Sequence, residues 1–365
     1  MYALTNLNFF KFSTSIVDLD VWPFILIFLL TIPCFIYIEK NAEDPVMNLK
    51  FFTDSNIRTT LLLSFLVGCG MMGIIFLPQF GENVLKIKAG SGGYIVTLMA
   101  VFSGVAAPLG GIFIDKYGAK IMLLIGFTCT IIGSLILALY TGNNPSFFSL
   151  LIGLIFIGLG MGFTMGTPIN YLMMNFVKKE DASLGQSTVS LVRSIGLTIS
   201  PNILIGFISQ AGLDVQTKLF STVTNLAPQI QGMPKGTSIL GNGVMTNNVS
   251  SATISKLQAA DVTTIVDTVK SFIDGILTTA LPGIKQGIAK AVINSPVASK
   301  IDFNLLLSNW QRDYILAIEK SRVVLENLFQ STMNTGFSKL FIGTALIACV
   351  GFIFTLTLKS EAHKI

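Results

Sequence analysis

The sequence predicts an all-α membrane protein that crosses the bilayer seven times and carries a large helical insertion outside the membrane. Of its 365 residues, 52% are hydrophobic and only 12% are charged, and the mean hydropathy is +0.71. Soluble domains carry roughly 25% charged residues, so this composition excludes a water-soluble fold. Seven segments reach the length of about 20 apolar residues that a helix needs to cross a hydrocarbon core of about 30 Å.

The seven predicted spans differ in how clearly the sequence marks them. The first is short and contains Pro23 and Pro33, which membrane helices tolerate when neighbouring groups satisfy the freed carbonyls. A cleaved signal peptide is the alternative, although no small-residue cleavage site follows Ile38. The predicted spans are residues 21–38, 59–80, 94–114, 121–140, 147–171, 189–208 and 337–358. They divide the chain into an N-terminal segment with one span (1–58), five spans (59–209), an external insertion (210–336) and a last span with its tail (337–365).

Lysine and arginine residues are distributed unequally between the two sides of the membrane. Basic segments resist translocation, so short cytoplasmic loops keep an excess of positive charge. One set of connections holds Lys40, Lys50, Arg58, Lys116, Lys120, Lys178, Lys179, Lys359 and Lys364, whereas the opposite short segments hold only Lys11, Lys86 and Lys88. We therefore expect a multi-pass protein of the cell membrane with its C-terminus in the cytoplasm. Its N-terminus then lies outside, which suggests that further spans belong upstream.

The residues that most enzymes and metal sites require are sparse. Each of the four cysteines lies in an apolar run without a Cys or His neighbour at metal-ligand spacing, and the single histidine, His363, is in the C-terminal tail. We therefore expect no enzyme activity, no metal and no cofactor. The net charge of +5 is arranged by membrane side and not as a basic patch, so nothing indicates a nucleic-acid partner.

A glycine-rich basic loop follows the third predicted span. It reads G-G-I-F-I-D-K-Y-G-A-K-I-M over residues 110–122. The glycines favour close helix approach and a very short turn, and Asp115 can cap a helix N-terminus or pair with a base. A tight basic loop is also a general topological feature. The stretch resembles the loop signature of the major facilitator superfamily, G-x-x-x-D-[RK]-x-G-x-[RK], through Gly111, Asp115, Lys116, Gly118 and Lys120.

A longer stretch, residues 45–208, is similar to the fourteen-span drug:proton antiporters, the multidrug efflux branch of this superfamily. The resemblance rests on D-P-V-M-N-L-K-F-F-T-D-S-N-I-R before the second span, F-L-P-Q-F at its end, G-L-G-M-G-F-T-M-G-T-P in the fifth, and G-Q-S-T-V-S-L-V-R-S-I-G at the entry into the sixth. It implies that spans two to seven are the six-helix C-terminal bundle of such a transporter. The first span is then half of the additional central helix pair.

The resemblance implies a transporter half that exports small amphipathic molecules across the lipid bilayer by alternating access. Such a half would need an N-terminal half encoded separately, or self-association, to enclose a substrate path. The alternative is a truncated membrane protein without transport activity, or a scaffold whose external cap binds a partner. The antiporter signature belongs to the N-terminal half, and spans two to seven contain no Asp or Glu, so the proton-coupling acid is expected upstream.

The sixth predicted span holds a charged residue and a set of candidate hinge residues. Arg193 lies about one turn inside it, so its side chain either reaches the cytoplasmic headgroups or pairs with Asp115, or with Glu180 and Asp181, as a cytoplasmic gate. The degenerate counterpart of the antiporter Gly-Pro cluster follows, and it acts as a hinge or only bends and packs the helix. Its residues are Gly196, Pro201 and Gly206.

By the same resemblance, the second and fifth spans face the central substrate cavity. Thioethers and aromatic rings adapt to varied amphipathic ligands, and uncharged amides within a span need a partner. Packing against lipid or against other helices is the alternative for each of these side chains. The candidates are Met71, Met72, Phe76 and Gln79 from the second span and Phe163 and Asn170 from the fifth.

The stretch between the sixth and seventh spans, residues 210–336, is expected outside. Its first part is rich in turn-forming residues. Apolar residues then share one helical face over residues 262–277, a second apolar face follows Pro282, and a third amphipathic helix is predicted over residues 304–329. We expect these helices to pack as a cap over the outer mouth or to lie on the outer leaflet.

Overall fold

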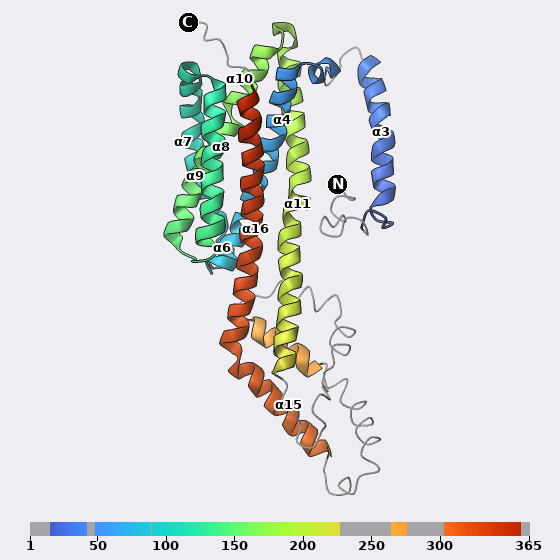
Figure 1. Cartoon of the computed structure of the whole chain (residues 1–365), viewed down its shortest axis with the longest axis vertical. Coiled ribbons are helices and arrows are strands. Elements are labelled where there is room, and N and C mark those ends of the chain that lie inside the picture. Colours follow the sequence, from blue (N-terminus) through green and yellow to red (C-terminus); the bar gives the residue numbers. More distant parts are fainter. Residues whose placement is uncertain (1–14, 42–47, 89, 227–263, 276–302, 359–365) are drawn as a thin grey trace. The chain divides into compact units, whose positions relative to one another are not determined.

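Helices account for all regular structure in the computed structural model, over residues 15–41, 48–88, 90–226, 264–275 and 303–358, which the structure describes (Figure 1). Seven helices or runs of helices in these ranges are long and apolar enough to cross a membrane, one at each predicted span. The chain is therefore an all-α membrane protein. Its spans are α3 (Trp22–Asn41), α4 to α6 (Ser55–Gly70, Met72–Ile75 and Leu77–Val84), α7 (Gly93–Tyr117), α8 (Ala119–Leu135) continued by the π-helix η3 (Ile136–Thr141), α9 and α10 (Phe147–Met165 and Thr167–Phe176), α11 (Ala182–Asn225) and α16 (Arg322–Thr357).

Two of the predicted spans are interrupted helices. The second span breaks at Met71 and again at Phe76, and the fifth breaks at Gly166, whose φ and ψ of −82° and −113° are not helical. A proline stands in the first turn after each of the breaks at Phe76 and Gly166, at Pro78 and Pro168. Proline cannot donate the backbone hydrogen bond that would continue the helix, and its ring clashes with the preceding turn. Hydropathy located both spans but could not show these interruptions.

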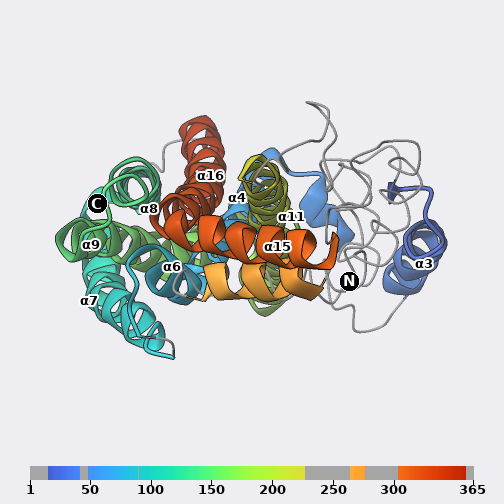
Figure 2. The ribbon, with the colours of Figure 1, turned by 90° about the horizontal axis from the view of Figure 1, so that it is seen from below.

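Helix α9 packs between α7 and α8, as the end-on view shows (Figure 2). The contacts are close because α9 presents glycine to both neighbours. A Cβ atom at Gly158 would lie 2.7 Å from the carbonyl oxygen of Met99 in α7, and one at Gly160 would lie 2.7 Å from that of Gly126 in α8. Small residues let membrane helices approach until their backbones touch, so the glycine pattern of α9 fixes this three-helix group.

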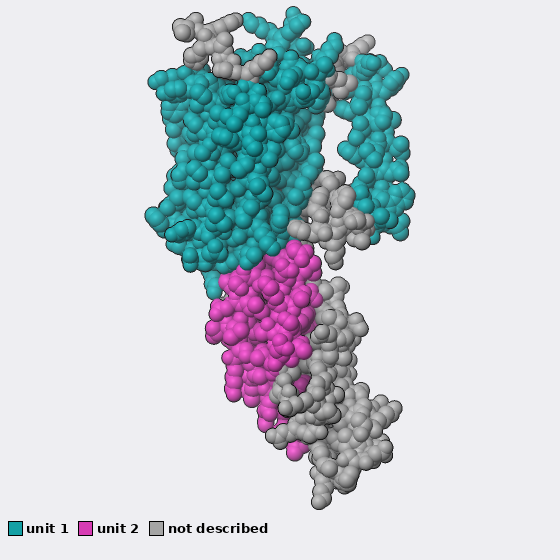
Figure 3. Space-filling model, viewed as in Figure 1, with its two compact units in different colours: residues 1–209, 334–365 teal, residues 210–333 magenta. Residues whose placement is uncertain are grey.

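The chain divides into two compact units, coloured separately in Figure 3. Unit 1 comprises residues 1–209 and 334–365, and unit 2 comprises residues 210–333. Helix α11 continues past the predicted span end at residue 208 to Asn225, and α16 begins at Arg322, ahead of the predicted span start at residue 337. The turn-rich stretch predicted to form a loop, at residues 228–248, lies outside the described residues. The continuation of α11 has a physical reason: Ala211, Val215, Leu219 and Val223 recur every four residues and are buried.

Unit 2 has a hydrophobic core of its own. It is built from the end of α11, a helix over residues 265–275, α15 (Phe303–Lys320) and the first turns of α16. The hydroxyl of the buried Tyr314 donates a hydrogen bond of 2.8 Å to the carbonyl oxygen of Val223, and its ring stacks on Trp310. The helix predicted over residues 304–329 is interrupted at Ser321. The predicted apolar face over residues 262–277 is partly described: Ile265, Val266, Val269 and Ile273 are buried, whereas residues 262, 276 and 277 and the face after Pro282 lie outside the described residues.

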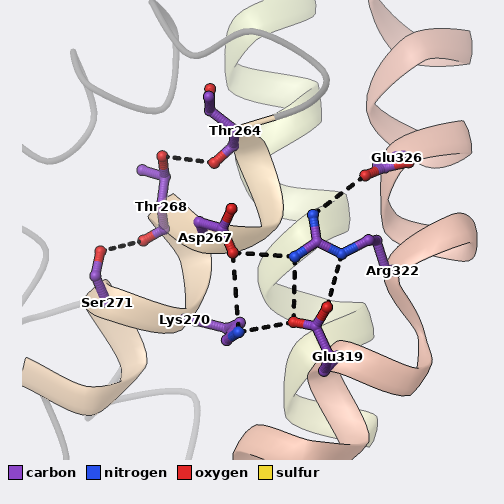
Figure 4. A network of polar contacts seen from close by, with 8 residues as sticks. All are labelled: Thr264, Asp267, Thr268, Lys270, Ser271, Glu319, Arg322 and Glu326. Atoms are coloured by element: carbon purple, nitrogen blue, oxygen red, sulfur yellow. Dashed lines mark hydrogen bonds and ion pairs between the residues drawn. The ribbon is translucent and has the colours of Figure 1, made fainter.

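Five charged residues join three helical segments of unit 2 (Figure 4). Arg322, at the start of α16, contacts Glu319 of α15 at 2.8 Å and Asp267 of the helix over residues 265–275 at 3.0 Å. Lys270 contacts the same Glu319 at 2.7 Å, and Glu326 lies 3.6 Å from Arg322. These hydrogen bonds hold the pKa of Glu319 at about 2, below its ordinary value of 4.5, with the bond from Arg322 the largest cause and that from Lys270 the next.

Candidate transport site

The loop between α7 and α8, which holds the predicted signature, is a single glycine turn. Gly118 has a φ of +83°, which a residue with a side chain rarely adopts, so the glycine is required by the backbone. Lys120 donates hydrogen bonds to the carbonyl oxygens of Leu358 and, at 2.9 Å, Leu356. It thus binds the C-terminal carbonyls of α16, where a cation also meets the negative end of the helix dipole.

The other signature residues are less engaged. Asp115 and Lys116 are exposed at the end of α7, and the Lys116 ammonium lies 5.3 Å from the ring centroid of Tyr117. Gly111 does not make the close approach proposed for it, because an added Cβ would lie 3.8 Å from the nearest atom, Thr167 Oγ1. The tighter position is Gly110, where a Cβ would lie 3.3 Å from the ring of Phe163.

The side chain of Arg193 is half-buried. Its Nε and Nη2 atoms are buried and have no hydrogen-bond partner among the described residues. Contact of its side chain with the cytoplasmic headgroups stays a prediction. In this conformation Arg193 forms no ion pair with Asp115, Glu180 or Asp181, all of which are described.

Helices α4 and α11 are in close backbone contact on either side of Arg193. A Cβ atom at Gly68 would collide with the carbonyl oxygen of Arg193, and one at Gly196 would collide with that of Phe65. The hydroxyl of Ser64 donates to the carbonyl oxygen of Val189, and that of Ser200 donates to Cys69, each at 2.9 Å. Two glycines and two serines therefore fix the backbone of α11 above and below the arginine.

The α4 side of this contact was not predicted from the sequence. Gly196 was expected to act as a hinge or only to pack the helix, and in the structure it is buried against α4. Pro201 and Gly206 lie within α11, which is continuous across all three positions. Ser64 and Gly68 on α4 are four residues apart, as are Gly196 and Ser200 on α11. This small-residue spacing is the signal that could have identified the contact.

A recess opens beside the break in the second span. Its empty space is about 400 Å³ including the open mouth, and it is entirely within unit 1. The side chains of Thr130 and Thr164 contribute hydroxyls, each of which donates to a carbonyl of its own helix. Gly70 borders the recess with no atom within 4 Å of an added Cβ. The lining comes from α4, α5, α8, α9 and α16, with Met71 between α4 and α5: Leu66, Val67, Gly70, Met71, Ile74, Phe127, Thr130, Ile157, Met161, Thr164, Ile347 and Ala348.

The six proposed cavity residues are not brought together. Met71 lines the recess, whereas Phe76 is buried next to the second break of the span. Gln79 is exposed on α6, and Phe163 packs against α7 and α8 at Gly110 and Gly126. Asn170 is half-buried on α10, and the side chain of Met72 lies outside the described residues. Of the candidates whose side chains are described, Met71 alone lines the recess.

The chain belongs to the major facilitator superfamily, a family of membrane transporters. Residues 21–212, just over half of the chain, match the model of that family. The chain is 32% identical over 219 residues to an uncharacterized MFS-type transporter, YfiU, of Bacillus subtilis; this match covers 59% of this chain and 41% of that protein. It is 27% identical over 263 residues to Multidrug resistance protein 3 of Bacillus subtilis, a match that covers 70% of this chain and 48% of that protein. It is 28% identical over 189 residues to the multidrug transporter protein MdtP of the same organism, a match that covers 51% of this chain and 35% of that protein. The chain thus spans less than half the length of each.

Proposed function

We propose that unit 1 supplies one half of the substrate path of a multidrug efflux transporter in the cell membrane. Alternating access needs two helical bundles that enclose a solute between them. The second bundle would come from another part of a longer polypeptide, from a separate subunit or from a second copy. The substrates would be small amphipathic molecules, in line with the names of the relatives just given.

The observation that supports this proposal most strongly is the pair of interrupted spans, α4 to α6 and α9 with α10, beside a recess. Interrupted helices expose backbone groups and bend without loss of further hydrogen bonds, which is why transporters place them at substrate sites. Met71 and Met161 border the recess, and thioethers adapt to ligands of varied shape. Membership of a transporter family then makes transport the simplest use of this geometry.

The test is ethidium efflux from the source cells that carry the wild-type gene, a deletion or a single variant. Gly70→Leu adds a side chain at the border of the recess, where its Cβ meets no atom within 4 Å, and Gly93→Leu adds the same side chain at the start of α7, where the Cβ also meets no atom within 4 Å. We expect the deletion and Gly70→Leu to slow efflux several-fold and Gly93→Leu to leave it unchanged. Equal efflux from the deletion strain and the wild type would contradict the proposal.

A second candidate function is a membrane scaffold whose unit 2 binds a partner. It is favoured by the separate core of unit 2 and by the ion-pair network that joins three of its segments. The efflux experiment separates the two candidates, because a scaffold predicts no change in solute accumulation when the gene is deleted.

A further inference from the structure

The guanidinium of Arg193 has an empty hydrogen-bonding edge. Its Nε and Nη2 atoms are both buried and have no partner among the described residues. The N–H groups on these two atoms point the same way in the plane of the guanidinium. Together they match the two oxygens of one carboxylate or phosphate group, which arginine binds as a fork.

The same chain contains an occupied copy of this arrangement. In unit 2, Nε of Arg322 contacts Oε1 of Glu319 at 2.8 Å, and its Nη2 contacts Oε2 at 3.2 Å (Figure 4). Arg322 thus uses the edge that Arg193 leaves empty. An oxyanion at Arg193 would complete the equivalent geometry inside unit 1.

The described helices of unit 1 offer no acid at the depth of Arg193. The acidic residues in residues 55–209 and 334–357 are Glu82, Asp115, Glu180 and Asp181, and all four stand at helix ends, as does Glu39 of α3. Arg193 lies 11 residues after the start of α11, about three turns into the helix. Buried N–H donors without acceptors are unfavourable, so an anion from outside these helices would stabilise the site.

The backbone of α11 at Arg193 is held in place by α4 without a ligand. The carbonyl oxygen of Arg193 is held against Gly68, and the hydrogen bonds from Ser64 to Val189 and from Ser200 to Cys69 secure α11 on either side. A side chain that projects from a rigid backbone loses less freedom on binding, which raises affinity. This distinguishes Arg193 from exposed basic residues such as Arg58.

We propose that Arg193 is an anion-binding residue of unit 1, and that its Nε–Nη2 edge receives the two oxygens of a carboxylate or phosphate group on an amphipathic solute. The inference rests on the proposed function in taking a transported solute as the source of the anion. It adds amphipathic molecules with an oxyanion at one end to the proposed substrates. An acid side chain of a neighbouring bundle is the other source of the same chemistry, and the test distinguishes the two.

The experiment measures binding of dansyl-labelled undecanoate to the purified full chain in a non-ionic detergent, with its methyl ester as the uncharged comparison. We expect Arg193→Gln to weaken binding of the carboxylate by about tenfold or more and to leave binding of the ester unchanged, because only the carboxylate uses the fork. Arg193→Lys should recover part of the affinity, since an ammonium supplies charge without the two-pronged geometry. Arg58→Gln, which removes an exposed arginine, is the matched control.

Equal binding of the carboxylate by the wild type and Arg193→Gln, or an equal loss for the ester, would overturn the proposal. Thermal melting without ligand checks the fold, and Arg193→Gln should melt no lower than the wild type because it removes an unpaired charge. Binding to the purified chain but not to the chain in membranes of its source cells would place a protein carboxylate on Arg193 and overturn the solute assignment. These readouts do not require transport, so failure of the Gly70→Leu efflux test would leave the anion site intact, and the converse also holds.

Discussion

At the scale of single residues, the α4–α11 contact depends on the absence of a side chain at Gly196. A Cβ there would lie 3.1 Å from the backbone nitrogen of Cys69 and would collide with the carbonyl oxygen of Phe65. Neither atom belongs to a flexible side chain. The two helices would have to separate, and the serine hydrogen bonds on either side would lengthen.

Gly196→Ala should therefore destabilise the protein by about 1–3 kcal/mol, the usual cost of overpacking a close contact. The measurement is the unfolding temperature of the purified chain in detergent. Gly70→Ala is the control, because an added Cβ there meets nothing within 4 Å. The same unfolding temperature for both variants would show that the contact is looser than the structure has it.

The surroundings of Arg193 could not be predicted from the sequence. The sequence located it inside a span and identified the acids that could pair with it, but spacing along the chain carries no distances between helices. The burial of its Nε and Nη2 atoms follows from the glycine contact between α4 and α11, which no local pattern of α11 specifies.

At the scale of helices, Lys120 caps α16. Its ammonium binds the carbonyl oxygens of Leu356 and Leu358, which have no partners within a helix that ends at Thr357. Lys120→Met should therefore raise the amide hydrogen-exchange rate over the last turn of α16, and Lys116→Met, an exposed neighbour, should not. An unchanged exchange rate in Lys120→Met would mean that the last turn is held by other contacts.

The charge network of unit 2 predicts a pH dependence. The pKa of Glu319 is lowered from 4.5 to about 2 by Arg322 and Lys270, so its contribution to stability is fully present above pH 4.5 and is lost as the pH falls toward 2. The unfolding temperature of the wild type should fall in this window relative to its value at pH 7, and that of Glu319→Gln should fall less. Parallel pH profiles for the two proteins would contradict the role of this carboxylate.

The sequence was most informative about where the membrane helices lie along the chain. Length and hydropathy placed all seven spans, because each needs a long apolar run that few other structures produce. The interruptions at Phe76 and Gly166 were not predicted, although Pro78 and Pro168 mark them. Proline alone was a weak signal, since α7 and α11 contain Pro108 and Pro201 and remain continuous.

At the scale of the whole molecule, the basic residues of the short loops predict a cytoplasmic C-terminus. A green fluorescent protein fused after Ile365 should therefore fluoresce, and an alkaline phosphatase fused at the same point should be inactive. The opposite pair of results would reverse the orientation and place the loop with Gly118 and Lys120 outside.

The central claim is that the recess beside the interrupted second span belongs to a substrate path. The most direct measurement is the maleimide labelling rate of Gly70→Cys, in a chain whose native Cys34, Cys69, Cys129 and Cys349 are replaced by alanine, in membranes of the source cells with and without ethidium. Ethidium should slow labelling of Gly70→Cys several-fold and leave labelling of Gly93→Cys unchanged, because only Gly70 lines the recess. Labelling of Gly70→Cys at the same rate with and without ethidium would contradict the account.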